Sequence, residues 1–135
     1  MLQKILAIDR GSKRIGLAWM DEENNTPLPL WYLENTSTVY FDMASLIAQY
    51  RITTIVYGYP EGNKGVMSKI DKFITSLKFS VADTVVFHPI DEHYSSTEAS
   101  NITWDLDHKH ISQDTISAMV ILERYLNRPD VPQDQ

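Results

Sequence analysis

The sequence predicts a single α/β domain built on a mixed five-stranded sheet, and three observations support this prediction. The 135-residue chain has 43% hydrophobic and 22% charged residues, ordinary values for a globular domain with a buried core. Strand-like segments come first, and strands then alternate with helices. Turns separate the segments, and no linker is long enough to divide the chain. We expect a domain over residues 1–128 and a flexible C-terminal tail over 129–135.

Three predicted strands open the chain as an antiparallel meander. The segments "LQKILAID" (2–9) and "IGLAWM" (15–20) are apolar, and the short connection between them contains Gly11, which favours a hairpin. The segment "LPLWYLE" (28–34) is the third predicted strand, and its early prolines suit the start of a strand or a sheet edge.

Helices and strands alternate in the rest of the chain. Apolar residues recur with a helical period over 40–50 and 65–79, and the second of these helices carries lysines on its other face. Two β-branched, apolar stretches predict buried strands over 52–60 and 83–90, the first of them running into a loop at Gly58 and Pro60. The later strands are therefore expected to be parallel, with helices packed against the sheet.

Two further helices are predicted near the C-terminus. Ser95 precedes Glu98 by three residues, the capping-box spacing, so a helix should begin just after Tyr94. The segment "ISQDTISAMVILERYLNRP" (111–129) carries one apolar stripe, and its Asn and Pro should end the final helix.

The charge pattern argues against a general nucleic-acid binder but leaves two local basic groups. The net charge is −6, from 12 basic and 18 acidic residues. The basic groups comprise Lys4, Arg10, Lys13 and Arg14, and then Lys64, Lys69, Lys72 and Lys78. Each group could equally be solvated surface. The absence of cysteine excludes disulfides and thiolate chemistry, and no segment approaches the length of a membrane span, so we expect a soluble, cytoplasmic protein.

Acidic residues stand at the ends of predicted elements, where open α/β sheets place their chemistry. Asp9 closes the first strand, Asp91 and Glu92 follow the last strand, and Asp114 lies in the first turn of the final helix. Each acid alone has a simpler explanation, as a turn former or as a residue favoured by the helix dipole. Together, carboxylates on separate elements can converge on Mg²⁺ or Mn²⁺ and serve phosphodiester hydrolysis.

Four stretches in order resemble the YqgF/RuvX family of RNase H-like proteins: "ILAIDRGSKRIGLAW", "VYGYP…G", "DEHYSSTEAS" and "QDTISAMVILERYL". The resemblance covers residues 4 to about 126 and implies an RNase H-like domain. Members are described as Holliday junction resolvases or as nucleases that mature the 5′ end of pre-16S rRNA. The implied function is therefore a metal-dependent endonuclease that acts on structured nucleic acid, with pre-rRNA processing favoured over branched DNA on family grounds.

The resemblance also assigns site residues. The family's metal-binding acids fall on Asp9, Glu92 and Asp114, which leaves Asp91 a structural role. Its loop glycine and proline fall on Gly58 and Pro60. Its Ser/Thr pair after the second acid falls on Ser95 and Ser96, with His93 just before them. The residues themselves add Lys13 and Arg14 as phosphate contacts, and Lys109 between two histidines of a predicted loop, as further substrate-binding candidates.

The chain departs from the family pattern at several positions. His93 stands where arginine is usual, so a fixed cation is replaced by a titratable one. Gly62 replaces an asparagine, and Val66 and Met67 stand where acidic residues are usual. These departures motivate a second hypothesis, a non-catalytic nucleic-acid or ribosome-binding module. A third, an actin-like phosphotransferase, would need a second domain half. Monomer and homodimer both stay open, since a symmetric junction requires two active sites.

Overall fold

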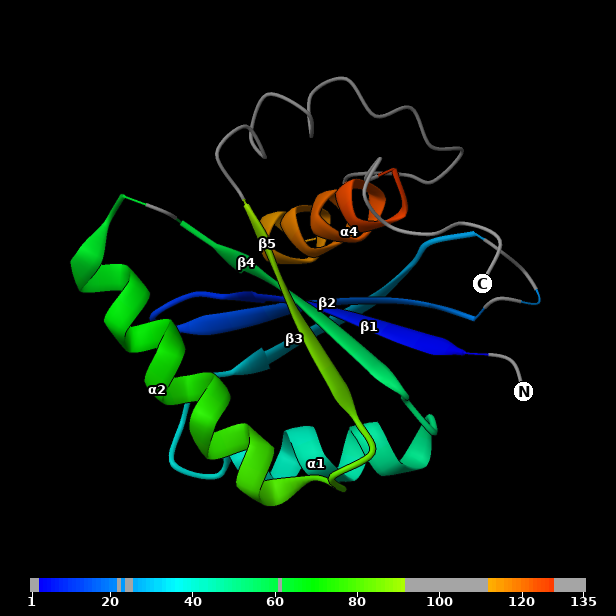
Figure 1. The fold of residues 1–135 in the computed structure, drawn as a ribbon, viewed down its shortest axis with the longest axis horizontal. Helices are drawn as coiled ribbons and strands as arrows, with labels where there is room; N and C mark the ends of the chain where they lie inside the picture. Colours follow the sequence, from blue (N-terminus) through cyan, green and yellow to red (C-terminus); the bar gives the residue numbers. More distant parts are fainter. Residues whose placement is uncertain (1–2, 22, 24–25, 61, 92–111, 128–135) are drawn as a thin grey trace.

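The computed structural model of this chain describes residues 3–21, 23, 26–60, 62–91 and 112–127. They form one five-stranded sheet with helices on both faces (Figure 1). The elements are β1 (Lys4–Arg10), β2 (Arg14–Asp21), β3 (Leu28–Glu34), α1 (Val39–Gln49), β4 (Thr54–Tyr59), α2 (Lys64–Ser80), β5 (Val86–Asp91) and α4 (Gln113–Leu126). The strand order is β3-β2-β1-β4-β5.

The predicted meander is confirmed. β1 pairs antiparallel with β2, in a register that sets Asp9 opposite Gly16. β2 pairs antiparallel with β3, which sets Gly16 opposite Tyr32. The register of this second pair shifts between Leu17 and Ala18, a β-bulge that becomes important below.

The two later strands are parallel to β1, as expected. β4 lies beside β1, and β5 lies beside β4 at the sheet edge. The sequence predicts Gly58 as a loop glycine, but it lies within β4, which continues to Tyr59. The physical reason is that β5 extends far enough to pair with it, since Gly58 lies opposite Ile90 and Tyr59 opposite Asp91. Gly58 is therefore a buried strand residue and not a loop residue.

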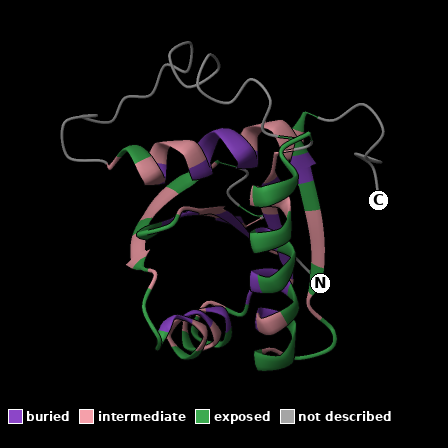
Figure 2. Ribbon diagram, turned by 90° about the vertical axis from the view of Figure 1, so that its left-hand side faces the viewer, coloured by how far each residue is buried: buried purple, intermediate pink, exposed green. Residues whose placement is uncertain are grey.

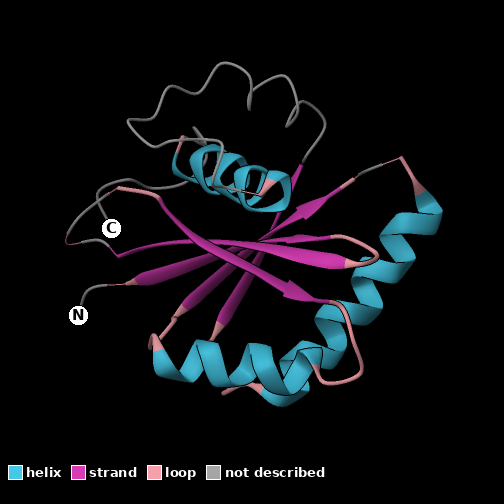
Figure 3. Ribbon diagram, turned by 180° about the vertical axis from the view of Figure 1, so that it is seen from behind, coloured by secondary structure: helices cyan, strands magenta, loops and turns pink. Residues whose placement is uncertain are grey.

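The sheet separates two hydrophobic cores, because successive strand residues point to opposite faces. Leu6 and Ile8 of β1 pack against α1 and α2, whereas Ile5 and Ala7 pack against α4. Figure 2 shows the resulting three layers, with the buried parts of the helices turned toward the sheet. Figure 3 shows the twisted sheet between α4 and the layer formed by α1 and α2.

The helices begin and end where their sequences predict. The Asn63 side chain caps α2 by accepting a hydrogen bond from the Val66 amide, at 3.2 Å. The Ser112 hydroxyl caps α4 in the same way, accepting from the Thr115 amide at 3.1 Å. α4 stops before Asn127. Its buried surface is wider than the predicted stripe and includes Val120 and Ile121.

Some predictions concern parts of the chain outside the described residues. These are the helix expected just after Tyr94 and the tail over 129–135, so both stay predictions. Among the residues that the structure does describe, no helix is long and apolar enough to span a membrane.

Candidate active site

Asp9 lies near the end of β1, on the sheet face covered by α4. It has the same strand parity as Ile5 and Ala7, which pack into the α4 core. On β2, the antiparallel partner of Asp9 is Gly16. On β4, Tyr57 lies beside Ile8, so the next residue, Gly58, lies at the level of Asp9. Glycines therefore stand on both neighbouring strands at the level of this carboxylate.

The first turn of α4 lies directly over β2 beside Asp9. A Cβ atom built on Gly16 would be 1.8 Å from the Asp114 carbonyl oxygen and 2.2 Å from its carbonyl carbon. Real Cβ atoms do not approach backbone this closely, so only glycine permits the contact. The contact brings Asp114 next to the strand position that pairs with Asp9. The predicted pair of acids on separate elements is therefore brought together.

Burial and a neighbouring carboxylate change the acidity of Asp9. Burial, and then the charge of Asp114, raise the pKa of Asp9 from the ordinary value of 3.8 to about 6, although a hydrogen bond from the Ser117 side chain opposes the rise. Ser117 lies one turn after Asp114 on α4. Sequence reasoning missed Ser117, because its role depends on how α4 sits on the sheet.

The chemistry of these carboxylates fits a divalent cation. Two acids at close quarters, one of them largely removed from water, repel each other, and a bound cation would relieve that repulsion. Carboxylate oxygens are also the ligands that Mg²⁺ prefers. Within the described part of the chain, no group of three or more acidic or histidine side chains is close enough to hold a metal ion. The third expected ligand, Glu92, lies outside the described residues, as do His93, Ser95, Ser96 and Lys109.

The two predicted phosphate contacts lie at the β1–β2 turn. Lys13 and Arg14 are exposed, and the Arg14 guanidinium lies over the Tyr32 ring, 4.7 Å from its centroid. The side-chain amide of Asn35 donates to the Gly11 carbonyl at 3.0 Å, and its backbone amide donates to the Lys13 carbonyl at 2.8 Å. Asn35 thus fixes the turn that carries the cations, a role that the sequence analysis did not find.

Arg10 does not join these cations at the Asp9 face. Its guanidinium lies 6.0 Å from the centroid of the Phe73 ring in α2, on the opposite side of the sheet. The four lysines of the second basic group all lie on α2 and are exposed.

Asp91 is the last residue of β5, and its side chain points to the same face as that of Phe87, which packs on the α1 and α2 side. It is therefore on the face opposite Asp9, which supports a structural role. Its backbone carbonyl accepts a hydrogen bond from the Arg124 guanidinium of α4. This bond ties the end of β5 to the helix that carries Asp114.

Two tyrosines flank Gly58, and both face the layer formed by α1 and α2. Their rings make an edge contact at 6.4 Å and pack against the core on that side. Tyr59 donates a hydrogen bond to Asp71 of α2 at 3.2 Å. Packing therefore accounts for both rings. Pro60, directly after β4, is half-buried.

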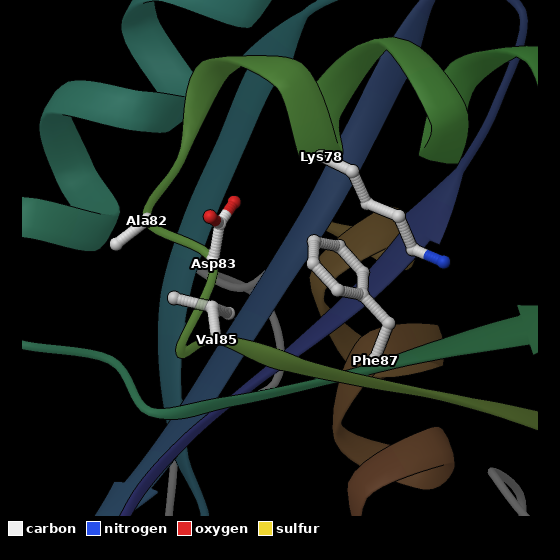
Figure 4. Close-up of a pocket in the computed structure, with 5 residues that line it drawn as sticks. All are labelled: Lys78, Ala82, Asp83, Val85 and Phe87. Atoms are coloured by element: carbon white, nitrogen blue, oxygen red, sulfur yellow. The ribbon is translucent and has the colours of Figure 1, made fainter.

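A cavity of about 290 Å³ lies beside the start of β5, at the end of the parallel strands opposite to Asp9. Figure 4 shows Lys78 extended beside the ring of Phe87, with Asp83 in the same wall. The Lys78 amine is 5.4 Å from that ring centroid. Because Asp9 stands at the other end of the parallel strands, this cavity is separate from the candidate site.

Comparison with known proteins decides the family. A family model described as "RuvX: Holliday junction resolvase" matches residues 3–128. The chain belongs to this family. The match confirms the family and the nuclease class expected from the sequence.

Relatives extend over nearly the whole chain. A protein of Sulfurihydrogenibium sp. (strain YO3AOP1) is 32% identical, over 94% of this chain and 92% of its own. One of Mycoplasmopsis synoviae (strain 53) is also 32% identical, over 90% of this chain and 96% of its own. Both are described as "Putative pre-16S rRNA nuclease".

A solved structure shares the fold. It is T. thermophilus RuvC in complex with a Holliday junction substrate, with a TM-score of 0.58 and 9% identity. The alignment covers 88% of this chain and 89% of the RuvC chain. The RNase H-like fold implied by the resemblance is thereby confirmed.

Proposed function

We propose that this protein is a divalent-cation-dependent endonuclease that processes the 5′ end of pre-16S rRNA in the cytoplasm. The observation that carries the proposal is the approach of Asp114 to the Asp9 carboxylate at the end of β1. The names of the two relatives support the choice of substrate. Precursor ribosomal particles are the physiological partners under this proposal.

The described residues suggest a division of labour. Asp9 and Asp114, with Glu92 as the third acid, would hold Mg²⁺ or Mn²⁺, which when bound polarises phosphate oxygens and makes water a better nucleophile. Ser117 donates to the Asp9 carboxylate and so favours its ionised, ligating form. Lys13 and Arg14 contact the phosphates beside the scissile bond and fix the strand.

Branched DNA is the alternative substrate, favoured by the description of the family model. A symmetric junction carries two equivalent strands, so its resolution would need a homodimer, whereas a monomer suffices to trim RNA. The two substrates therefore differ in the oligomeric state that they require.

A cleavage assay tests the proposal. Labelled pre-16S rRNA 5′ leader and a labelled four-way DNA junction are each incubated with the protein and Mg²⁺ or Mn²⁺. We expect cation-dependent cutting of the RNA at a defined position. Cutting of the junction alone would show that the substrate is branched DNA and not pre-rRNA. Binding without cutting, in every cation condition, would leave a non-catalytic binding module.

A further inference from the structure

Trp31 has an unusual backbone and an exposed side chain. Its φ is 107°, in a region that bulky L residues rarely adopt. Its side chain is 53% exposed, although it lies in the middle of β3. Residues in such strained conformations persist where surrounding structure holds them, and they cluster at functional sites.

A β-bulge accounts for the orientation of the Trp31 ring. Consecutive strand residues normally point to opposite faces, so their rings do not meet. Here Trp31 and Tyr32 are stacked, with centroids 4.9 Å apart and planes 27° apart. The register shift between Leu17 and Ala18 lies directly opposite Trp31. Bulges re-aim side chains in this way beside active sites.

Two neighbours hold this aromatic pair. The Thr115 hydroxyl, which is fully buried, donates to the Trp31 carbonyl at 2.9 Å. On the other side, the Arg14 guanidinium covers the Tyr32 ring at 4.7 Å. The Arg14 guanidinium, the Tyr32 ring and the half-exposed Trp31 ring therefore lie together at the β3 edge of the sheet.

The aromatic pair is tied to the candidate active site. Tyr32 pairs with Gly16, and Gly16 pairs with Asp9, so Tyr32 stands two strand spacings, about 10 Å, from the Asp9 position. Thr115 follows Asp114 directly in α4. The first turn of α4 therefore contacts β3 at Trp31 and β2 beside Asp9.

We propose that Trp31 is a base-stacking residue that holds an unpaired nucleotide of the strand bound at Asp9. This rests on the proposed function and names one contact of its substrate. Every base has a π face, so the contact tolerates any sequence, while Arg14 meets the neighbouring phosphate. Tyr32, on which Trp31 stacks, stands about 10 Å from Asp9, and at about 3.4 Å per stacked nucleotide this places the base within about three nucleotides of the scissile phosphate.

The stacking contact is tested by measuring the binding of short single-stranded leader RNA. The fluorescent base 2-aminopurine, which stacking on an aromatic ring quenches, is placed at successive positions of this RNA. All variants carry Asp9→Asn so that the RNA stays intact. We expect quenching of the 2-aminopurine fluorescence at one position near the cut, and Trp31→Ala should abolish it and weaken binding roughly 5- to 150-fold. Trp31→Phe should retain most of both. Phe79→Ala is the matched control, since Phe79 is 88% exposed on α2.

An abasic site in the RNA gives a second readout, because it removes the stacked base and leaves the Trp31 side chain in place. Placed at the quenched position, it should weaken binding of the protein with Trp31 intact and have little further effect on Trp31→Ala. Equal binding of the Trp31→Ala and Phe79→Ala variants, or no binding of single strands at all, would overturn the stacking proposal. Cleavage lost in Asp9→Asn but unchanged in Trp31→Ala would overturn it while leaving the nuclease standing.

Discussion

The carbonyl group of Asp114 in α4 lies against the Cα atom of Gly16 in β2, with no room for a side chain between them. This contact sets the height of α4 above the sheet. It thereby determines how close Asp114 and Ser117 come to Asp9, which pairs with Gly16 across the hairpin.

Gly16→Ala should therefore damage stability and activity together. The new methyl group would meet rigid backbone at 1.8 Å, so α4 must move away. We expect a loss of about 1–3 kcal/mol in the free energy of unfolding, typical of overpacking, and a loss of cleavage at temperatures where the variant is folded. Urea unfolding and a cleavage assay measure the two effects.

Gly65→Ala is the matched control for that substitution. A Cβ atom at Gly65 would meet only the Asn63 side-chain oxygen, at 3.8 Å, an ordinary contact. Alanine also suits a helix better than glycine does. Gly65→Ala should leave cleavage unchanged, and equal losses in the two variants would contradict the account of Gly16.

Asp9→Asn should stabilise the cation-free protein, increasingly so as the pH rises. Because the pKa of Asp9 is about 6 when folded and 3.8 ordinarily, the folded state binds the proton more tightly. Ionisation therefore lowers the free energy of unfolding as pH rises from about 4 to 6, by up to about 3 kcal/mol. Asparagine at position 9 does not ionise, so the variant does not lose this stability. Urea unfolding of both proteins from pH 4 to 8 in EDTA measures their difference in the free energy of unfolding. A difference that does not change with pH would contradict this prediction.

Divalent cations should raise the melting temperature of the unaltered protein and leave Asp9→Asn nearly unchanged. A ligand that binds only the folded state stabilises it by mass action, and the ionised Asp9 carboxylate is needed to bind it. The rise should be larger at pH 8 than at pH 5, where Asp9 is mostly protonated. Sodium chloride at matched ionic strength is the control, and an equal rise in both proteins would exclude this site.

Ser117→Ala should shift the pH dependence of cleavage. The Ser117 hydrogen bond lowers the pKa of Asp9, so its removal should raise that pKa and move the acid limb of the rate profile to higher pH. We expect about a tenfold loss near pH 6 that narrows toward pH 8. Ser117→Thr keeps the hydroxyl and should preserve the profile. A uniform loss at every pH would assign Ser117 a packing role instead.

Some of this site could be predicted from sequence, and the reasons are physical. Asp9 was found because it ends a buried apolar run, and Asp114 because it opens a strongly periodic helix. Ser117, Gly16 and Trp31 were missed as site residues because their roles arise only when α4 docks on β2 and β3. An isolated glycine in a buried strand could have signalled the close approach at Gly16.

The prediction of Gly58 as a loop residue was wrong for a related reason. Gly58 reads as a turn residue in isolation, and only its pairing with Ile90 of β5 keeps it in the strand. Residues 92–111 lie outside the described part of the chain. The assignments of Glu92, His93, Ser95, Ser96 and Lys109 therefore stay predictions.

Single-turnover cleavage of pre-16S rRNA leader by Asp9→Asn, Asp114→Asn and Asp91→Asn tests the central claim most directly. Asp91 is the matched control, a carboxylate at the same end of the parallel strands but on β5, two strands from β1, and with the parity of the opposite face. Changes in the outer partners of metal ligands cost about 10- to 100-fold, so loss of a ligand itself should cost at least about 100-fold. The account predicts that loss for Asp9→Asn and Asp114→Asn and near-normal rates for Asp91→Asn. Normal cleavage by Asp9→Asn, or equal losses in all three, would contradict it.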